Sequence, residues 1–524
     1  MLIFQKGEKI LIREKQYLKR FRIILFLIFL VLSSYVLNAQ EDSTVKGKSI
    51  IRKSPVTILR EDLKSILDNP DLANSEIGVY VRSCRNGETI FKMNESKNFI
   101  PASLTKLFTT SAALNFFKPD FRYSTRVYLD GSLSKTGIFE GNVIIRASGD
   151  PSISEKFNVD VVSLLKQWAM TLDSLGIKEI NGNLICDDRY FDNQYYAPGW
   201  CVDDLIYPFA APIEAIAVYD NTIKIMVSPG DSVGELSKIE IIPHNNFVDV
   251  RNGITTVAYD QPESVLAERN KELEIIELSG TIPYDSTKKH SSELDISVNN
   301  PVSFFLSLFK EVILEEGIGF NGALLDYSSA GYDIDYRNMN PIIRYSSPTL
   351  LNIISNINKE SNNLAAEMLL KTLGKEGTGE GSFAAGVKEV KQYCKSIGIP
   401  STNVIIFDGS GLSRYNLLQP KYLVDLLFKI YFSDYREIFI STLARPGKFG
   451  TLKRRMTNSK AEKRVFAKTG SMNNVMNLAG YVTTQDGEYL SFAIMIMNHN
   501  VQESLVQNII DLFCMRLATF SRKE

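Results

Sequence analysis

Three short polar motifs in this chain contain the residue types that serine-based acyl transfer requires. They are Ser103-Leu104-Thr105-Lys106, Ser361-Asn362-Asn363 and Lys468-Thr469-Gly470. A serine hydroxyl is a poor nucleophile at neutral pH, so it needs a base within hydrogen-bond reach. Residues three positions apart on a helix share one face, and this spacing makes Lys106 the local base for Ser103. The three motifs together predict one active site assembled from distant parts of the chain.

The residues around Ser103 predict that it lies at the start of a helix. Pro101 stands where a first helical turn favours proline, and the mostly apolar run from Leu107 to Leu114 follows. Five other serines have a lysine three positions on but lack this setting or the two later motifs: Ser43, Ser132, Ser163, Ser286 and Ser307. Lys135-Thr136-Gly137 also repeats the third motif, but among turn residues. We therefore assign the nucleophile to Ser103, with an ordinary helix-start serine as the alternative.

Lys106 can act as a base only while its amine is neutral. The pKa of an ordinary lysine is about 10.4, so it must fall by several units. Burial and a second cation nearby both lower the pKa of a lysine, and we expect Lys468 to be that cation.

The second motif supplies further catalytic groups. We expect Ser361 to relay a proton toward the leaving amine, and Asn363 to hold a substrate amide and the head group of Lys106. A polar helix cap is the alternative for this motif. Negative charge develops on the carbonyl oxygen during acyl transfer, and the backbone amides of Ser103 and Ser471 are our candidates to stabilise it.

The third motif is predicted to bind substrate along a strand over residues 464–471. Lys468 would attract a substrate carboxylate, and Thr469 would donate a hydrogen bond to it. Gly470 would let a substrate backbone lie against the strand edge. The alternative is a strand lysine followed by a turn glycine.

Composition limits the other classes of function. A chain of 524 residues is too long for one core, so two or three domains are expected. The 59 basic and 60 acidic side chains give a net charge of -1, which does not favour a nucleic-acid partner. Only His244, His290 and His499 are present, and no cluster has zinc-ligand spacing. We therefore expect neither a histidine-based serine hydrolase nor a metal or other cofactor.

The first forty residues predict export. Basic residues precede the apolar run from Ile23 to Leu37, and Ala39 is a suitable cleavage residue. This pattern indicates a signal peptide over residues 1–39, so we expect a periplasmic or cell-envelope protein without a stable membrane span after cleavage. An uncleaved anchor helix is the alternative, although the apolar run is shorter than the roughly 20 residues that span a bilayer.

Export would place the five cysteines in an oxidising space. A disulfide between Cys186 and Cys201 and a set of unpaired thiols both stay open at this stage.

Both ends of the mature chain predict strands of one antiparallel sheet. One hairpin is expected from residues 77–81 and 89–91 around Asn86-Gly87, and a second from residues 477–482 and 489–496. A last helix is expected over about residues 504–520, so terminal helices would back the sheet.

About 250 residues separate the first motif from the second, which is too many for a loop and indicates inserted domains. Strand-like segments cover residues 124–129, 141–145, 224–227 and 273–278, and helix-like segments cover about 302–316 and 347–373. Met368, Leu369 and Leu370 are expected to anchor the last segment in the core.

The chain order of the motifs resembles that of the class C low-molecular-mass penicillin-binding proteins, the D-alanyl-D-alanine carboxypeptidase and endopeptidase family. Further matching stretches are Gly149-Asp150-Pro151, Pro198-Gly199-Trp200, Asp408 to Arg414 and Gly450-Thr451-Leu452. The resemblance runs from about Ala73 to the C-terminus, and compact β-lactamases lack so large an insertion. Cys201, directly after Trp200, departs from the family pattern and leaves the local shape of that segment open.

The resemblance implies an α+β fold. A β-lactamase/transpeptidase-like catalytic domain, built from an antiparallel sheet with helices, would be interrupted by inserted β-rich modules. The catalytic domain would comprise residues 56–120 and 335–524. The modules would occupy residues 121–334, with one nested in the other.

The resemblance also implies a reaction. A serine D,D-peptidase would cleave D-Ala-D-Ala or D-Ala-diamino acid bonds of peptidoglycan stem peptides through an acyl-enzyme on Ser103, and β-lactam antibiotics would inhibit it covalently. Arg414 and Asn473 would line the cleft. Asp204 and Phe209 would reach over the cleft toward the ammonium of the diamino acid. The alternative for Asp204 is a solvated surface carboxylate, and the alternative for Phe209 is a core residue.

Two other functions stay open. A β-lactamase or esterase on the same scaffold would differ only in how quickly water removes the acyl group. A non-catalytic peptidoglycan-binding scaffold would keep the fold without the reaction.

Overall fold

The computed structural model describes residues 53–270, 275–285 and 290–523. The predicted signal peptide over residues 1–39 lies outside this part of the chain. Among the described residues, no helix combines the length and the apolar character needed to cross a bilayer.

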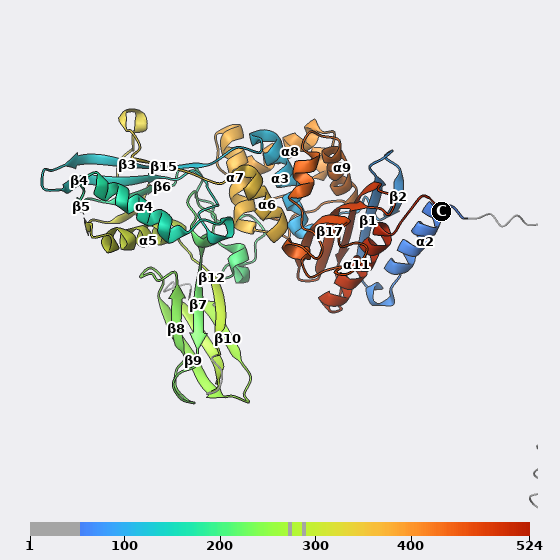
Figure 1. Cartoon of the computed structure of the whole chain (residues 1–524), viewed down its shortest axis with the longest axis horizontal. Coiled ribbons are helices and arrows are strands. Elements are labelled where there is room, and N and C mark those ends of the chain that lie inside the picture. Colours follow the sequence, from blue (N-terminus) through green and yellow to red (C-terminus); the bar gives the residue numbers. More distant parts are fainter. Residues whose placement is uncertain (1–52, 271–274, 286–289, 524) are drawn as a thin grey trace, which may run out of the picture. The chain divides into compact units, whose positions relative to one another are not determined.

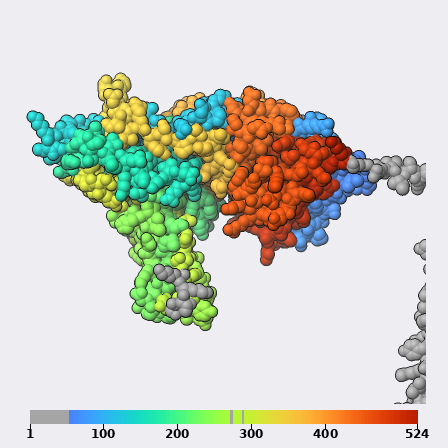
Figure 2. Space-filling model, in the orientation of Figure 1, coloured from blue at the N-terminus to red at the C-terminus, as the bar shows by residue number. Residues whose placement is uncertain are grey.

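A five-stranded antiparallel sheet unites the two ends of the described chain (Figure 1). Its strand order is β16 (Val465–Met472), β17 (Val475–Thr483), β18 (Tyr489–Met497), β1 (Glu76–Ser83) and β2 (Thr89–Met93). Strands β17–β18 and β1–β2 are the two predicted hairpins, which are thus confirmed. Figure 2 shows the blue N-terminal and red C-terminal surfaces side by side, as the shared sheet requires.

Helices cover both faces of this sheet because its central strands are apolar on both sides. Helices α2 (Pro55–Leu67) and α11 (Glu503–Ala518) contribute Leu63 and Phe513 to one core, which includes Leu478 of β17. Helix α9 (Pro420–Tyr431) contributes Leu427 to the opposite core, which includes the neighbouring Ala479. Alternate residues of a strand point to opposite faces, so β17 is buried from both sides. Helix α11 is the predicted last helix.

A group of helices packs on the α9 side of the sheet. The turn η2 (Ala102–Leu104) leads into α3 (Thr105–Phe117), and α3 is buried along residues 105–114. Around it lie α6 (Leu350–Glu360), α7 (Asn363–Thr378), α8 (Phe383–Ser396) and α10 (Arg436–Ser441). The polar residues Thr109, Thr110 and Ser111 of this buried helix satisfy their hydroxyls by hydrogen bonds to backbone carbonyls.

The helix-like run predicted over residues 347–373 is in fact two helices. Ser361 ends α6 in a left-handed conformation, with φ 63° and ψ 33°. The Asn362 side chain then caps α7 by accepting a hydrogen bond from the amide of Ala365. Asparagine is a favourable N-cap, so the polar residues of the second motif break the helix and place Ser361 at the junction.

A seven-stranded mixed sheet lies between the first and second motifs in the chain. One path runs β13 (Gly319–Asn321), β5 (Glu179–Asn181), β4 (Ile138–Arg146), β3 (Ser124–Leu133) and β15 (Ile343–Ser346). Strand β6 (Leu184–Asp187) also pairs with β4, and β14 (Leu324–Asp326) pairs with β6. Helices α4 (Val161–Ser174) and α5 (Pro301–Glu315) lie on one side of these strands (Figure 1).

Two three-stranded sheets are nested between β6 and α5 in the chain. One has the order β12 (Ser292–Ser297), β7 (Thr222–Ser228) and β8 (Lys238–Ile242). The other has the order β10 (Ser264–Arg269), β11 (Ile276–Tyr284) and β9 (Val250–Ala258), with β11 and β9 parallel. The fold is therefore α+β. Its predicted division into domains stays a proposal, whose second boundary we would move from residue 334 to about residue 346 because β15 pairs with β3.

Short 3₁₀ turns connect these elements: η1 (Pro70–Leu72), η3 (Glu155–Phe157), η4 (Val202–Asp204), η5 (Pro208–Ala210), η6 (Tyr219–Asn221), η7 (Tyr336–Asn338), η8 (Ser401–Asn403) and η9 (Gly450–Leu452).

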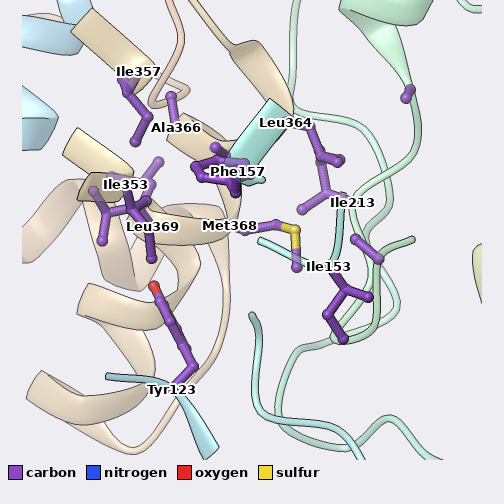
Figure 3. Close-up of a cluster of buried hydrophobic side chains, with 14 of the residues drawn as sticks. Tyr123, Ile153, Phe157, Ile213, Ile353, Ile357, Leu364, Ala366, Met368 and Leu369 are labelled. Carbon is purple, nitrogen blue, oxygen red and sulfur yellow. The ribbon is translucent and has the colours of Figure 1, made fainter. Parts of the chain in front are cut away.

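An apolar cluster joins α7 to the inserted segment that carries η4 and η5. Figure 3 shows Ile153, Phe157 and Ile213 of the insertion gathered around Leu364 and Met368 of α7. Met368 and the two leucines that follow it are fully buried, so their predicted role as anchors in the core is confirmed. This packing fixes the insertion against the start of α7, where the second motif lies.

Candidate active site

The three motifs converge on one cleft of about 360 Å³. Its lining consists of Ser103, Asp204, Phe209, Ser361, Asn363, Gly411, Leu412, Arg414, Ser471, Met472 and Asn473. Eight of the twelve residues predicted from the sequence are in this lining. The other four are Lys106, Lys468 and Gly470, which are buried behind it, and Thr469, which lies beside it.

The Lys106 amine has three oxygen neighbours. Its Nζ lies 2.9 Å from Ser103 Oγ, 2.6 Å from Asn363 Oδ1 and 2.8 Å from the carbonyl oxygen of Ser410. The side chain is fully buried although it is basic. The start of α3, the start of α7 and the loop at Ser410 therefore meet at one nitrogen atom.

The Lys468 amine lies on the other side of the second motif. Its Nζ donates to Ser361 Oγ at 2.9 Å and to the carbonyl oxygen of Thr469 at 2.9 Å. The left-handed conformation of Ser361 is uncommon for a residue with a side chain and is found where surrounding structure enforces it. Here it holds a hydroxyl in the cleft and against Lys468.

Burial sets the ionisation of both lysines. It lowers the pKa of Lys106 to about 7, and the negative charges of Glu367 and Asp408 oppose this shift. Burial lowers the pKa of Lys468 as well, and the positive charge of Lys106 lowers it further. We expected burial and the charge of Lys468 to lower the pKa of Lys106. Burial does so, whereas the repulsion between the two amines lowers the pKa of Lys468.

Glu367 is a buried group that sequence reasoning missed. Its carboxylate accepts hydrogen bonds from the amides of Gly409 and Ser410, both at 2.7 Å. The Ser410 carbonyl is also a neighbour of Lys106 Nζ, so Glu367 holds the backbone that holds the amine. Burial and the charge of Asp408 raise the pKa of Glu367 to about 8. Glu367 follows Asn363 by four residues, so the two lie on the same face of α7. This spacing is the one feature of the sequence that could have identified Glu367 as part of the site.

Asp408 organises the same loop. Its carboxylate accepts from the amides of Gly411 and Ser413 and from the side chain of Asn416. The indole of Trp200 donates to it at 3.0 Å, which connects the loop to the inserted segment. The matching stretch that begins at Asp408 thus serves to build the cleft wall.

The inserted segment forms the facing wall of the cleft. Asp204 of η4 and Phe209 of η5 both line it, as the resemblance implied. Phe209 is half-exposed and its ring stacks on that of Tyr207, so it is not a core residue. Asn363 Nδ2 donates to the Phe209 carbonyl at 2.7 Å, which leaves one amide hydrogen of Asn363 free for a substrate.

Strand β16 forms the cleft edge with its outer backbone groups. The Ala467 amide donates to the Ala444 carbonyl on the side away from β17. The N–H groups of successive residues point to opposite edges of a strand. The amides of Thr469 and Ser471 therefore face the same outer edge as that of Ala467. Ser471 lines the cleft there, and the Thr469 hydroxyl contacts that of Thr451 at 2.9 Å.

Gly470 has a different role from the predicted one. A Cβ on Gly470 would lie 2.6 Å from the Pro101 carbonyl oxygen. The Asn477 side chain of β17 donates to the same carbonyl at 2.9 Å. Gly470 therefore lets β16 approach the turn that carries Ser103, rather than making room for substrate.

The five cysteines are free thiols. Cys186 is buried in β6 and Cys201 is exposed beside η4, so the structure does not join this pair.

The fold and the cleft define a serine acyl-transfer enzyme with a β-lactamase-like catalytic sheet and large insertions. The sequence profile of the D-Ala-D-Ala carboxypeptidase 3 (S13) family matches residues 59–518. The chain belongs to this family and is a serine-type D-Ala-D-Ala carboxypeptidase.

Individual relatives agree with this assignment. The chain is 28% identical to a D-alanyl-D-alanine carboxypeptidase of Actinomadura sp. (strain R39), over 89% of this chain and 85% of that protein. The crystal structure of penicillin-binding protein 4 (dacB) from Haemophilus influenzae has the same fold, with a TM-score of 0.76, 24% identity and coverage of 86% and 98% of the two chains. A second crystal structure of that protein, complexed with a β-lactam, has a TM-score of 0.70 and 23% identity, with coverage of 87% and 98%.

Replacing Gly411 with alanine tests how tightly the nucleophile is positioned. Gly411 has φ +89°, and a Cβ there would lie 1.9 Å from the Ala102 carbonyl oxygen, directly before Ser103. Because a displacement of about 1 Å can slow an enzyme roughly 100-fold, we expect Gly411→Ala to lower kcat/KM for D-alanine release by about that factor. Steady-state kinetics with a D-Ala-D-Ala peptide measure the effect.

Gly398 provides a matched control, because it has φ +82° and nothing within 4 Å of the added methyl group. Gly398→Ala should lower stability by about 1 kcal/mol through backbone strain and keep its kcat/KM. Wild-type kcat/KM in Gly411→Ala would contradict this account of the loop.

Proposed function

We propose that this enzyme cleaves D-Ala-D-Ala or D-Ala-diamino acid bonds of peptidoglycan stem peptides through an acyl-enzyme on Ser103. The observation that carries the proposal is the buried amine of Lys106, 2.9 Å from the Ser103 hydroxyl. Its pKa, lowered to about 7, suits a general base near neutral pH.

Burial favours the neutral form of Lys106, and the hydrogen bonds around the amine can accommodate that form. The oxygens of Asn363 and Ser410 are carbonyl acceptors, so they take the two hydrogens of a neutral amine. The nitrogen lone pair is then left for the third neighbour, the Ser103 hydroxyl, which donates its proton to it. A protonated amine would instead donate to all three oxygens and leave no acceptor for the serine proton.

Acylation follows from this arrangement. Ser103 Oγ attacks the carbonyl carbon of the penultimate D-alanine as its proton passes to Lys106. The negative charge that develops on the carbonyl oxygen would be stabilised by the amides of Ser103 and Ser471, since β16 presents the second of these to the cleft. The bond between carbon and serine oxygen forms while the carbonyl double bond opens.

Collapse of this intermediate breaks the peptide bond. The leaving amine needs a proton, which we assign to a relay from Lys106 through the hydroxyl of Ser361. Ser361 lines the cleft and accepts a hydrogen bond from Lys468 at 2.9 Å, so its own proton is directed elsewhere. Water then attacks the ester, and Lys106 accepts the proton of that water by the same geometry.

The third motif would hold the substrate carboxylate. Lys468 is buried, and its pKa is lowered by burial and by Lys106, so an arriving carboxylate raises that pKa and favours the charged form. The Thr469 hydroxyl stands at the same edge and donates to the Thr451 hydroxyl at 2.9 Å, and its proton would turn to the carboxylate when substrate binds. Lys468 is therefore most often charged, and attracts the carboxylate most strongly, when substrate is bound.

The far end of the cleft would read the side chain of the diamino acid. Asp204 and Arg414 line the cleft, as do Phe209 and Asn473, and we assign this role to them. A carboxylate and a guanidinium suit the ammonium and carboxylate of a diamino acid, and the aromatic ring suits its methylene chain. In an endopeptidase substrate the diamino acid is the leaving group, whereas in a carboxypeptidase substrate D-alanine is the leaving group.

Slow deacylation by water is also expected with β-lactams, which would make them covalent inhibitors. Asp204 is the only carboxylate among the residues that line the cleft in the described part of the chain. The nearby Glu367 and Asp408 are occupied by backbone amides. This favours a peptidase over a β-lactamase. The proposed substrate and the predicted signal peptide both support a location in the periplasm or cell envelope.

Covalent labelling tests the nucleophile. Fluorescent penicillin should label the mature enzyme at Ser103, and peptide mass spectrometry should find the adduct there. Ser103→Ala should abolish labelling and the release of D-alanine from defined muropeptides. Ser132, on β3, also has a lysine three positions on but lacks the two later motifs. Ser132→Ala should keep both the labelling and the release of D-alanine. Equal labelling of Ser103→Ala and wild type would refute the proposal.

The pH dependence of acylation tests the base. Below pH 7 Lys106 is protonated and cannot accept the Ser103 proton, so the second-order rate constant with penicillin should rise through a midpoint near pH 7. Penicillin stays ionised over this range because carboxylates titrate near pH 4 or below. Stopped-flow measurements between pH 5.5 and 10.5 provide the profile. A rate constant that is flat, or that rises only above pH 9, would show that Lys106 is not the base.

A further inference from the structure

We propose that the face of the seven-stranded sheet opposite α4 and α5 holds a second binding site for peptidoglycan, where arginines of three neighbouring strands, in and beside a groove, bind stem-peptide carboxylates. The three are Arg344 of β15, Arg126 of β3 and Arg146 of β4, and we call them the arginine ladder. The choice of occupant rests on the proposed function, whereas the site itself rests on the geometry below.

Strand register places the ladder on one face of the sheet. Arg126 is directly opposite Arg344 on one side and directly opposite Arg146 on the other. Residues that are opposite each other on adjacent strands point to the same face, with strands about 4.8 Å apart. Three arginine side chains therefore leave the same face from neighbouring positions, and like charges opposite each other on adjacent strands are destabilising.

This face is opposite the one that α4 and α5 cover (Figure 1). Val127 and Ile145, which alternate with the ladder, belong to the main core, while Tyr128 and Ile144 share the ladder face. Residues 327–339 cover the middle of the ladder face through Ile334. Arg146 and Arg344, toward its end, are exposed.

Two members of the ladder line two adjoining cavities, and Arg344, opposite Arg126 on β15, lies outside their lining. One of about 260 Å³ is lined by Arg122, Arg126, Arg146 and Glu376, among others, and one of about 310 Å³ by Arg146, Arg189, Asp187 and Lys375, among others. Arg146, Ala147 and Tyr190 line both, so the cavities form one groove.

The carboxylates of the groove do not neutralise the ladder. Glu376 accepts from the Tyr190 hydroxyl, and Asp187 pairs with Arg189 and accepts from Tyr336. Across residues 53–270, 275–285 and 290–523, no carboxylate lies within salt-bridge distance of Arg126, Arg146 or Arg344. Arg146 stacks on the Tyr336 ring at 4.4 Å, and Arg126 makes a long hydrogen bond to Ser124.

The chemistry of the groove selects an anion with several acceptor oxygens. Guanidinium groups bind carboxylate or phosphate through paired hydrogen bonds. Tyr190 and Tyr336 flank the groove and suit the apolar parts of a sugar or peptide. Stem peptides bear several carboxylates at intervals, which fits three cations in a row.

Helix α7 connects this groove to the catalytic cleft. Asn363 at its start lines the cleft, and Lys375 and Glu376 near its end line the groove. At 1.5 Å per residue the two ends are about 20 Å apart. A polymer that occupies both sites would gain affinity because the second contact becomes intramolecular. The ladder would thus hold a neighbouring part of the wall polymer while the cleft cuts a stem peptide.

A charge-loss variant tests the ladder. The variant combines Arg126→Gln, Arg146→Gln and Arg344→Gln. The probe is a fluorescein-labelled soluble glycan with uncrosslinked stem peptides, and anisotropy is measured with enzyme that penicillin has already acylated, so that the cleft is blocked. We expect blocked wild type to bind and the variant to bind at least tenfold more weakly at low salt. The difference should shrink as salt screens the charges.

The matched control removes the same charge elsewhere. Lys388→Gln, Lys391→Gln and Lys395→Gln on α8 should leave binding within twofold of wild type. All variants should keep the melting temperature and the penicillin acylation rate of wild type, which separates loss of the ladder from unfolding. Equal binding by the ladder variant, or an equal loss in the α8 control, would overturn the proposal.

Two further probes test the ligand. The same glycan with amidated carboxylates should bind wild type as weakly as it binds the ladder variant; undiminished binding would overturn the carboxylate assignment. Poly(glycerol phosphate) should compete weakly; tighter, ladder-dependent binding of this polymer would make a phosphate polymer the ligand and overturn the assignment to peptidoglycan. Absence of penicillin labelling on wild type would refute the proposed function instead, and glycan binding would then be measured on the unblocked enzyme.

Discussion

The burial of one lysine amine is the constraint on which the rest of this active site depends. Removing a charged ammonium from water costs several kcal/mol unless partners compensate for it. Around Lys106 the partners are two carbonyl oxygens and one hydroxyl, an arrangement that a neutral amine satisfies fully. The protein thus obtains a base near neutral pH by desolvation, and the serine beside it becomes a nucleophile.

Much of the surrounding structure serves to hold those three oxygens in place. The break between α6 and α7 orients Asn363, and Glu367 fixes the Ser410 carbonyl through two backbone amides. Gly470 lets β16 pack against the turn that carries Ser103. The helix break, Glu367 with its loop, and Gly470 belong to different parts of the chain. This explains why the motifs are so far apart in sequence. The insertion completes the cleft with Asp204 and Phe209, and the Phe209 carbonyl accepts a hydrogen bond from the Asn363 side chain that contacts Lys106.

The sequence was most informative where structure is local. Hairpins follow from strand patterns around a turn, and the serine–lysine spacing follows from helical geometry, so both were predictable. The break at Ser361 was foreseen only as the helix-cap alternative for the second motif, because helix periodicity continues on both sides of it and only the cap residues mark it. Glu367 was missed because a buried carboxylate depends on amides about forty residues away. The arginine ladder was equally hidden, since β15 pairs with a strand about 200 residues earlier.

The protonation state of Lys106 is the central claim, and it can be observed directly. Enzyme with ¹⁵N-labelled lysine, compared with its Lys106→Arg variant, identifies the Lys106 Nζ resonance, and its chemical shift is then followed from pH 5 to 11. The account predicts a transition near pH 7, with neutral amine above it. A transition near pH 10, as in an exposed lysine, would contradict the account.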